Sequence, residues 1–537
     1  MRKNMNFIIA ILLIFISISS SQAVPLSTKS RWIVDEDTGR RVKLACANWE
    51  GHVSMLPEGL HKQPLDHIAR GFSLMGFNCV RLTYATYMFT HNAHLTVAQN
   101  FENNNLTSAL KGMTKHNPQL LGLTLADAQK AVIDALGSHG VMVLLDCQVS
   151  KPMWCCSNDD GNGFFGDQYF SPQDWLKALS IVAKRYKDTP MVMAMSLRNE
   201  LRGPLQNQSV WYKYVEKGAK LIHRENPNVL VLISGLDYDI DFTFLKNNPL
   251  PLQNLNQKLV YETHRYAFTE GQLDFWTNTS INYMCKNITQ EIETKSGFLR
   301  SGKDAAPLFI TEFGINLSED DQADSSFVTC LLAWMAQNDL DWAIWAGHGS
   351  YYLRDGNQDP EETYGMFDAT WKKVRNPDFH TKLQLVLQTL QDPFSRHETY
   401  KVMYHPLSGT CGVAHKNQVL AAGGCWKTTQ WSYRGEGSPI RLKGTNRCLM
   451  AVGDGLPVLL SDDCSGESSS WKLAKNSMYQ LANKDENGNH LCLDFDPHVS
   501  KMVLTTKCIV AEEDDPDYIK LQRPESQWFL LVDSNAK

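Results

Sequence analysis

Two glutamates, Glu200 and Glu312, stand at the ends of short apolar runs and have polar and aromatic neighbours. Two carboxyl groups that face one cleft can divide the work of bond cleavage, because one can donate a proton while the other stays ionised. A single glutamate at the end of a strand is usually a solvated loop residue. Two of them in such company indicate a catalytic pair.

Five further residues suited to this chemistry also lie at the ends of predicted strands: Arg81, Asn199, His264, Tyr266 and Trp345. Hydrolysis of a glycosidic bond fits the set, since one carboxyl would protonate the leaving oxygen and the other would attack the anomeric carbon. Asn199 could bond a sugar hydroxyl, and Arg81 would keep the nucleophile ionised. His264 and Tyr266 could tune protonation, and Trp345 offers a flat face to a pyranose ring. Arg81 could also be an ordinary ion-pair partner, and Trp345 could belong to the core.

Eight short apolar runs alternate with amphipathic stretches and are predicted strands. They cover residues 42–47, 78–84, 141–147, 191–199, 229–235, 258–264, 308–313 and 341–346. Because these runs are almost continuously apolar, we expect strands that are buried on both faces. Amphipathic helices are predicted over 125–137, 172–186 and 211–225, and a last helix over 382–390.

This alternation predicts an α/β fold, a (β/α)8 TIM barrel over residues 24–393, followed by an all-β domain. The C-terminal ends of barrel strands form one face, so all of the candidate residues would meet there. A doubly wound open sheet is the alternative. The open sheet is disfavoured because no Gly-x-Gly-x-x-Gly motif or phosphate loop follows any predicted strand. A serine hydrolase is disfavoured because the sequence contains no Gly-x-Ser-x-Gly elbow.

Around these residues the sequence resembles glycoside hydrolase family 5, the cellulase family. The motifs that carry the resemblance are Asn199-Glu200, His264-x-Tyr266, Thr311-Glu312-Phe313-Gly314 and Trp345. It implies that Glu200 is the acid/base and Glu312 the nucleophile of a retaining mechanism, with the other five residues in supporting positions. It also implies a β-linked polysaccharide or oligosaccharide substrate of the β-glucan or β-mannan type.

Two positions depart from the family pattern. Leu201 stands where a proline usually follows the acid/base, and Gln148 stands where a histidine commonly ends the third strand. An amide can bond a sugar hydroxyl but cannot titrate, so we expect altered subsite preference or rate. Because both carboxylates are present, we do not expect loss of activity. No metal or organic cofactor is expected, since side chains supply the acid, the base and the nucleophile.

The last part of the chain, residues 402–537, has a different organisation. Three units follow one another, each with a Cys pair and a later Trp: Cys411/Cys425/Trp431, Cys448/Cys464/Trp471 and Cys492/Cys508/Trp528. A threefold all-β repeat predicts a β-trefoil, and the segment resembles the ricin-type lectin family, which implies a carbohydrate ligand. Since the Gln-x-Trp mark is replaced at Ser469 and Ser526, we expect the second and third Trp to anchor the core.

The N-terminus and the cysteines indicate a secreted protein. Basic Arg2 and Lys3, an apolar run over residues 7–18 and small residues up to Ala23 predict a signal peptide over 1–23, with an uncleaved anchor as the alternative. No later apolar stretch is long enough to span a membrane. With 13 cysteines, at least one must be unpaired or bridged to another chain. Five sequons fit a glycoprotein: Asn105, Asn207, Asn278, Asn287 and Asn316.

Composition excludes several other classes of protein. Against 58 Asp and Glu stand 52 Lys and Arg, so a basic surplus for nucleic-acid binding is lacking. Taken with the carboxylate pair, the family resemblance and the predicted signal peptide, the sequence predicts a secreted retaining glycosidase that takes part in polysaccharide catabolism. The alternative is a secreted lectin-like protein whose barrel is catalytically weakened.

Overall fold

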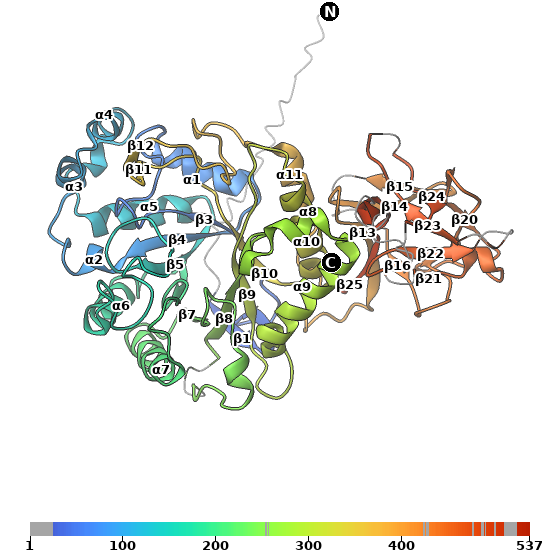
Figure 1. The fold of residues 1–537 in the computed structure, drawn as a ribbon, viewed down its shortest axis with the longest axis horizontal. Coiled ribbons are helices and arrows are strands. Elements are labelled where there is room, and N and C mark those ends of the chain that lie inside the picture. Colours follow the sequence, from blue (N-terminus) through green and yellow to red (C-terminus); the bar gives the residue numbers. More distant parts are fainter. Residues whose placement is uncertain are drawn as a thin grey trace, which may run out of the picture.

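The structure is a computed structural model of the 537-residue chain. It describes residues 25–252, 255, 257–422, 425, 429–474, 477–484, 488, 490–498, 501–509 and 523–536, so the predicted signal peptide lies outside the described residues. A large barrel with surrounding helices forms one part, and a β-rich C-terminal part packs against its side (Figure 1). Among the helices described, none combines the length and the apolar character that crossing a membrane requires.

Eight parallel strands close into a barrel in the order β10-β3-β4-β5-β6-β7-β8-β9. The strands are β3 (Ala45–Trp49), β4 (Cys79–Ala85), β5 (Met142–Val149), β6 (Val192–Ser196), β7 (Leu230–Ser234), β8 (Leu259–His264), β9 (Leu308–Phe313) and β10 (Asp341–Ile344). Each overlaps a predicted run, and almost every residue in them is buried. The barrel prediction is confirmed, and the open sheet is wrong because β10 pairs with both β9 and β3.

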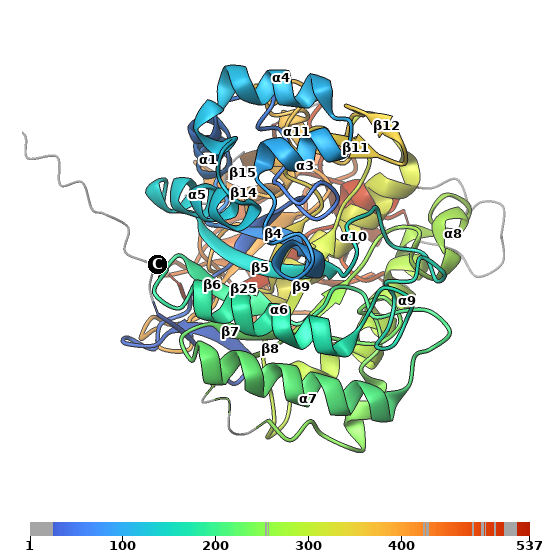
Figure 2. The same cartoon turned by 90° about the vertical axis from the view of Figure 1, so that its left-hand side faces the viewer.

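Helices cover the outside of the barrel, and three of them were predicted (Figure 2). They are α1 (Leu65–Leu74), α2 (Thr86–Phe89), α3 (Val97–Asn103), α4 (Thr107–His116), α5 (Leu125–Ser138), α6 (Pro172–Arg185), α7 (Gln208–Glu225), α8 (Leu273–Asn278), α9 (Ile281–Lys295), α10 (Gln322–Asn338) and α11 (Pro377–Lys382). The predicted helices α5 and α6 begin where the side chains of Thr124 and Ser171 accept a hydrogen bond from the third backbone N–H of the helix.

The last barrel helix does not lie where the sequence predicts it. Helix α11 starts at Pro377, after the capping side chain of Asn376, and it ends at Lys382, where the predicted helix over 382–390 begins. Residues 383–388 form hydrogen-bonded turns that mix three- and four-residue spacings. Buried Leu383, Val386 and Leu390 have helical spacing, which explains the error, but Leu385 is buried too.

The C-terminal part is all-β, as predicted. One sheet holds β13 (Tyr400–His405), β14 (Thr410–His415), β15 (Gln418–Ala422), β16 (Trp431–Ser432), β17 (Arg441–Leu442), β18 (Cys448–Met450), β20 (Leu459–Ser461) and β25 (Leu530–Ser534). The other holds β19 (Leu456–Pro457), β21 (Lys472–Leu473), β22 (Leu481–Lys484), β23 (His490–Asp494) and β24 (Leu504–Lys507). The trefoil topology and the boundary at 393–402 stay predictions.

Two short hairpins complete the described strands. One, β1 (Leu26–Lys29) with β2 (Trp32–Asp35), precedes the barrel, and the other, β11 (Leu353–Arg354) with β12 (Asn357–Gln358), follows β10. Neither was predicted, because runs of two to four residues carry too little alternation to be recognised.

Six disulfides join twelve of the thirteen cysteines. Three join the cysteines of the pairs that mark the C-terminal units, Cys411–Cys425, Cys448–Cys464 and Cys492–Cys508. The barrel holds Cys46–Cys79, Cys285–Cys330 and a bond between the adjacent Cys155 and Cys156. Cys147, buried in β5, is the free thiol.

The core of the barrel continues into the C-terminal part. Trp528, on the side of that part nearest the barrel, belongs to the same apolar cluster as the barrel residues. Its indole Nε1 donates to Asn282 Oδ1 on α9 at 2.9 Å, and Asn282 Nδ2 donates to Gln480 Oε1 at 2.8 Å. Trp431 and Trp471 lie in a second cluster within the C-terminal part. All three indoles are fully buried, which confirms the expectation that Trp471 and Trp528 anchor the core.

Trp528→Ala should loosen the barrel as well as the C-terminal part. It opens a cavity and leaves Asn282 Oδ1 without its donor, at a cost of about 3–5 kcal/mol. Hydrogen exchange read by mass spectrometry should show faster exchange in α9. The matched control Trp431→Ala removes an equally buried indole from the second cluster and should leave α9 unchanged. Unchanged exchange of α9 in Trp528→Ala would show that the barrel does not depend on this contact.

Candidate active site

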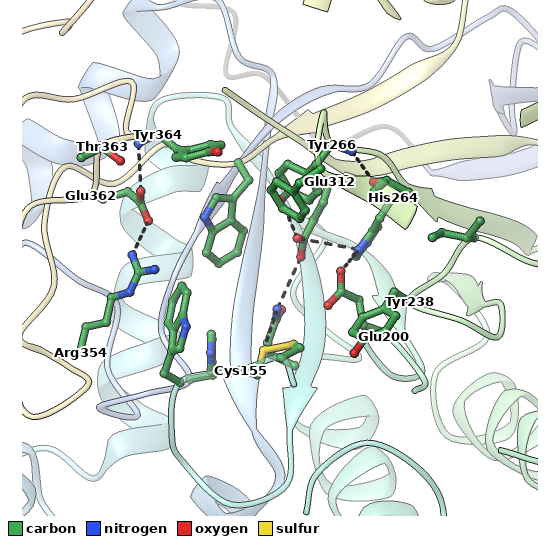
Figure 3. Close-up of a pocket in the computed structure, with 18 residues that line it drawn as sticks. Cys155, Glu200, Tyr238, His264, Tyr266, Glu312, Arg354, Glu362, Thr363 and Tyr364 are labelled. Atoms are coloured by element: carbon green, nitrogen blue, oxygen red, sulfur yellow. Dashed lines mark hydrogen bonds and ion pairs between the residues drawn. A yellow bond between two sulfur atoms is a disulfide. The ribbon is translucent and has the colours of Figure 1, made fainter. Parts of the chain in front are cut away.

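The candidate residues gather at the C-terminal ends of the barrel strands, around a cavity of about 540 Å³ (Figure 3). Five of the seven predicted site residues line it: Glu200, His264, Tyr266, Glu312 and Trp345. The other two, Arg81 and Asn199, lie beneath its floor with no exposed surface. The volume falls within the roughly 300–1,000 Å³ of small-ligand pockets. The structure therefore brings all seven residues together.

Glu312, on β9, is held by donors on both of its oxygens. Arg81 donates to Oε1 at 2.6 Å, and the hydroxyl of Tyr266 donates to Oε2 at 3.0 Å. Burial opposes ionisation of this carboxyl, but the positive charges of His264 and Arg81 outweigh it and lower the pKa of Glu312. Glu312 is therefore ionised at neutral pH and has the charge state that a nucleophile needs.

Arg81, on β4, connects the floor of the site. Its guanidinium donates to Asn48 Oδ1 on β3 and to Asn199 Oδ1, both at 2.8 Å, and it pairs with Asp146 on β5 at 3.0 Å. Burial would lower the pKa of Arg81, but the carboxyl groups of Asp146, Glu312 and Glu262 raise it, so the charge of Arg81 is permanent. One side chain thus positions Asn199 and also keeps Glu312 ionised. The sequence allows two roles for Arg81, an ion-pair partner and a group that keeps Glu312 ionised, and its contact with Glu312 is compatible with both.

Glu200 follows β6 in a backbone conformation that is rare for a residue with a side chain. Its φ is 41°, in the left-handed region, and its N–H donates to Asp239 Oδ2 at 3.1 Å. Such positions are strained and persist where the surroundings fix them, often at functional sites. The conformation turns the carboxyl of Glu200 toward His264, whose Nδ1 lies 2.9 Å from Oε1.

His264 lies between the two glutamates. Its Nδ1 is 3.8 Å from Glu312 Oε2, and its Nε2 is 3.1 Å from Thr311 Oγ1 and 3.5 Å from Asp239. Burial would lower the pKa of His264, but the carboxylates of Glu312, Asp239 and Glu200 raise it to about 9. An imidazolium therefore bridges the carboxyl groups and can donate a hydrogen bond to Glu200.

Several residues of the site were missed or only flagged by sequence reasoning. Gln148 lines the cavity, with its Nε2 3.5 Å from Glu312 Oε1 and 3.9 Å from Cys155 Sγ. The disulfide of Cys155 and Cys156 lines the cavity too, and Asn199 Nδ2 contacts Cys156 Sγ at 3.6 Å. Adjacent cysteines were the one signal for it. Asp239 had none, because it lies in a loop beyond the predicted strand.

Two groups of side chains at the site have the spacing of metal ligands. Among the described residues, oxygens or nitrogens of Glu200, His264 and Glu312 lie within 4.8 Å of one another, as do those of Asp239, Glu262 and His264. Arg81 already occupies Glu312, and the imidazolium of His264 faces both sets. Two permanent or near-permanent cations would repel a metal ion, so the arrangement is better suited to proton transfer.

His264→Gln should change how stability depends on pH. Because the pKa of His264 is raised in the fold, its contribution is complete below about pH 6.5 and is lost as pH rises toward 9. The stability difference between the two proteins should therefore shrink over that range, by on the order of 3 kcal/mol. Urea unfolding at several pH values measures it, with the exposed His94→Gln as control. An equal difference at pH 6 and above 9 would mean that folded His264 is neutral.

Comparison with known proteins assigns the family. A family model described as Cellulase (glycosyl hydrolase family 5) matches residues 39–350. The chain is 41% identical to a Glycosyl hydrolase 5 family protein of Chamaecyparis obtusa, over 99% of this chain and 97% of that protein. It is 22% identical to an Endoglucanase of Paenibacillus polymyxa, over 59% of this chain and 78% of that protein.

A solved structure shares the barrel fold. The hyperthermophilic endocellulase of the archaeon Pyrococcus horikoshii superimposes with a TM-score of 0.54 at 20% identity, covering 68% of this chain and all of that chain. The family match covers more than half of this chain, and the relative from Chamaecyparis obtusa matches it almost from end to end. The chain therefore belongs to glycoside hydrolase family 5.

Proposed function

We propose that the protein is a secreted retaining glycosidase that hydrolyses β-linked glucans or their oligosaccharides. The observation that carries the proposal is the pair Glu200 and Glu312, which have oxygens within 4.8 Å of each other and of His264. Retaining enzymes place their carboxyl groups about 5–5.5 Å apart and inverting enzymes ~6.5–9.5 Å apart. The close pair favours retention, and the relatives named endoglucanase and endocellulase favour β-glucan over β-mannan.

In the first step, Glu312 Oε attacks the anomeric carbon while Glu200 gives its proton to the glycosidic oxygen. The carbon–oxygen bond breaks, the leaving sugar departs as an alcohol, and the glycone is held as an ester of Glu312. In the second step, the Glu200 carboxylate takes a proton from water, whose oxygen attacks the anomeric carbon and releases Glu312. One molecule of water is consumed for each glycosidic bond cleaved: its hydroxyl stays on the anomeric carbon, its proton returns to Glu200, and both carboxyl groups regain their starting states.

The neighbouring side chains have complementary tasks in this proposal. Arg81 and Tyr266 orient the carboxylate of Glu312 for attack on the anomeric carbon through hydrogen bonds to its two oxygens. His264 donates to Glu200 and stabilises the carboxylate that remains after proton transfer. Trp345, at the cavity wall, provides the face on which the sugar ring stacks.

The C-terminal part would bind carbohydrate and keep the barrel near its substrate. Three disulfides and an all-β architecture support a carbohydrate-binding module. Because Trp471 and Trp528 are buried, the ligand would be bound by other side chains. Secretion is proposed from the predicted signal peptide. A lectin with a weakened barrel is the less favoured alternative, since both carboxylates and their donors are in place.

Glu312→Ala should abolish turnover without unfolding the protein. The change removes the proposed nucleophile, and the loss should be at least about 10⁴-fold in kcat on an aryl β-glucoside and on β-glucan oligosaccharides. Glu319→Ala, an exposed glutamate near it in the chain, is the control and should keep wild-type activity. Undiminished activity in Glu312→Ala would show that this cavity is not the active site. The lectin alternative would be supported if the folded wild-type protein bound β-glucan oligosaccharides or the corresponding mannans but cleaved neither.

Glu200→Gln should separate the two steps. It should lose roughly 10²–10⁴-fold on oligosaccharides, whose leaving group needs a proton, and much less in the first turnover of a nitrophenyl glycoside. A glycosyl-enzyme should then accumulate on Glu312, detectable by mass spectrometry, because no base activates water. NMR of the first product formed by the wild type should show the β-anomer. An α-anomer would contradict the retaining assignment.

A further inference from the structure

Two loops contact each other beside the cavity, and both contribute side chains to its lining. The loop after β5, residues 150–171, carries Trp154, and the loop after β10, residues 345–376, carries Tyr351 and Arg354. The guanidinium of Arg354 lies 3.7 Å over the Trp154 ring, and the ring centroids of Trp154 and Tyr351 are 5.5 Å apart. Strands β3 and β4 separate β5 from β10 in the barrel, so these contacts bridge two strands.

The loop of Trp154 is fixed from below. The disulfide of Cys155 and Cys156 follows Trp154 directly, and its sulfurs contact amides on the floor of the site. Asn162 Oδ1 accepts hydrogen bonds from the backbone of Ser150 and Lys151, and buried Arg198 donates to the carbonyl of Asn162 at 2.7 Å. A loop with so many buried partners keeps Trp154 in place before any ligand arrives.

The loop of Arg354 is fixed in the same way. Glu362 is buried and accepts hydrogen bonds from the Tyr351 hydroxyl and from the backbone N–H of Tyr364. Arg354 reaches the same carboxylate, with 3.5 Å between Nη1 and Oε2. The wall is therefore a built structure: an aromatic ring, a cation on its face and a buried carboxylate that orients the cation.

The position of the wall relative to the two glutamates assigns it to the glycone side. In the proposed mechanism Glu200 protonates the leaving oxygen, so the aglycone departs on the side of Glu200. The sugar attacked by Glu312 then extends in the other direction. Figure 3 shows Arg354 and Glu362 on one side of Glu312, with Glu200 and Tyr238 on the opposite side.

We infer that the cavity is blind on its glycone side and that the protein cleaves from the non-reducing end of its substrate. This inference rests on the proposed function and specifies its substrate: the chain ends of β-glucan oligosaccharides rather than the interior of a polymer. A terminal sugar ends in free hydroxyls, which Arg354 and Glu362 can bond as donor and acceptor. An interior sugar would continue as a chain into Trp154.

The first test uses wild-type protein and a series of β-glucan oligosaccharides of increasing length, each labelled at its reducing end. At low conversion, each substrate should yield one labelled product, shortened by the same number of sugars whatever the starting length. Early formation of labelled products of many lengths would overturn the inference while leaving the proposed glycosidase intact. Failure to cleave any oligosaccharide or aryl glycoside would instead refute the proposed function, and the inference with it.

The second test opens the wall. Trp154→Ala and Arg354→Ala should each gain internal cleavage, seen as a several-fold greater fall in viscosity of a soluble β-glucan per new reducing end. Arg31→Ala is the matched control, because it removes an arginine from the face of Trp32, 4.3 Å away in the β1–β2 hairpin. It should keep the wild-type product pattern. If both wall variants are folded by circular dichroism and keep that pattern too, the wall does not select chain ends.

Discussion

The buried charge of Arg81 is the constraint on which the site depends. A guanidinium with no exposed surface is stable only when its neighbours compensate for lost hydration, and here they come from four strands or strand ends: Asn48, Asp146, Asn199 and Glu312. Closing the barrel brings these groups to one point. Glu312, the proposed nucleophile, is therefore positioned by the same contacts that compensate the charge of Arg81.

The acidic groups around Glu312 differ in how burial and neighbouring charges affect their ionisation. Burial raises the pKa of Asp146 to about 7 and also raises the pKa of Asp239, whereas the neighbouring cations lower the pKa of Glu312. Glu262 accepts hydrogen bonds from Ser234 and Thr311 in the layer below. Arg81 and His264 both approach Glu312, at 2.6 Å and 3.8 Å, and their charges keep this carboxyl ionised.

Sequence patterns predicted the parts of this protein that repeat a simple physical rule. Barrel strands are buried on both faces, so their apolar runs were recognisable, and the residues at strand ends, such as Glu200 and Glu312, indicated where the cavity lies. Loop geometry follows no such rule. The contact between Trp154 and Arg354 joins residues two hundred positions apart. Asp239 accepts a hydrogen bond from the backbone N–H of Glu200, whose left-handed conformation no sequence pattern indicated.

The C-terminal part also packs against the helices on either side of the strand that carries Glu312. Strand β9 lies in the chain between α9 and α10, which the Cys285–Cys330 disulfide joins to each other. The C-terminal part packs against both helices, through Trp528 on α9 and through β25 on α10 (Figure 1). The C-terminal part, which we propose to bind carbohydrate, therefore also packs against the two helices that flank the strand of Glu312 in the chain.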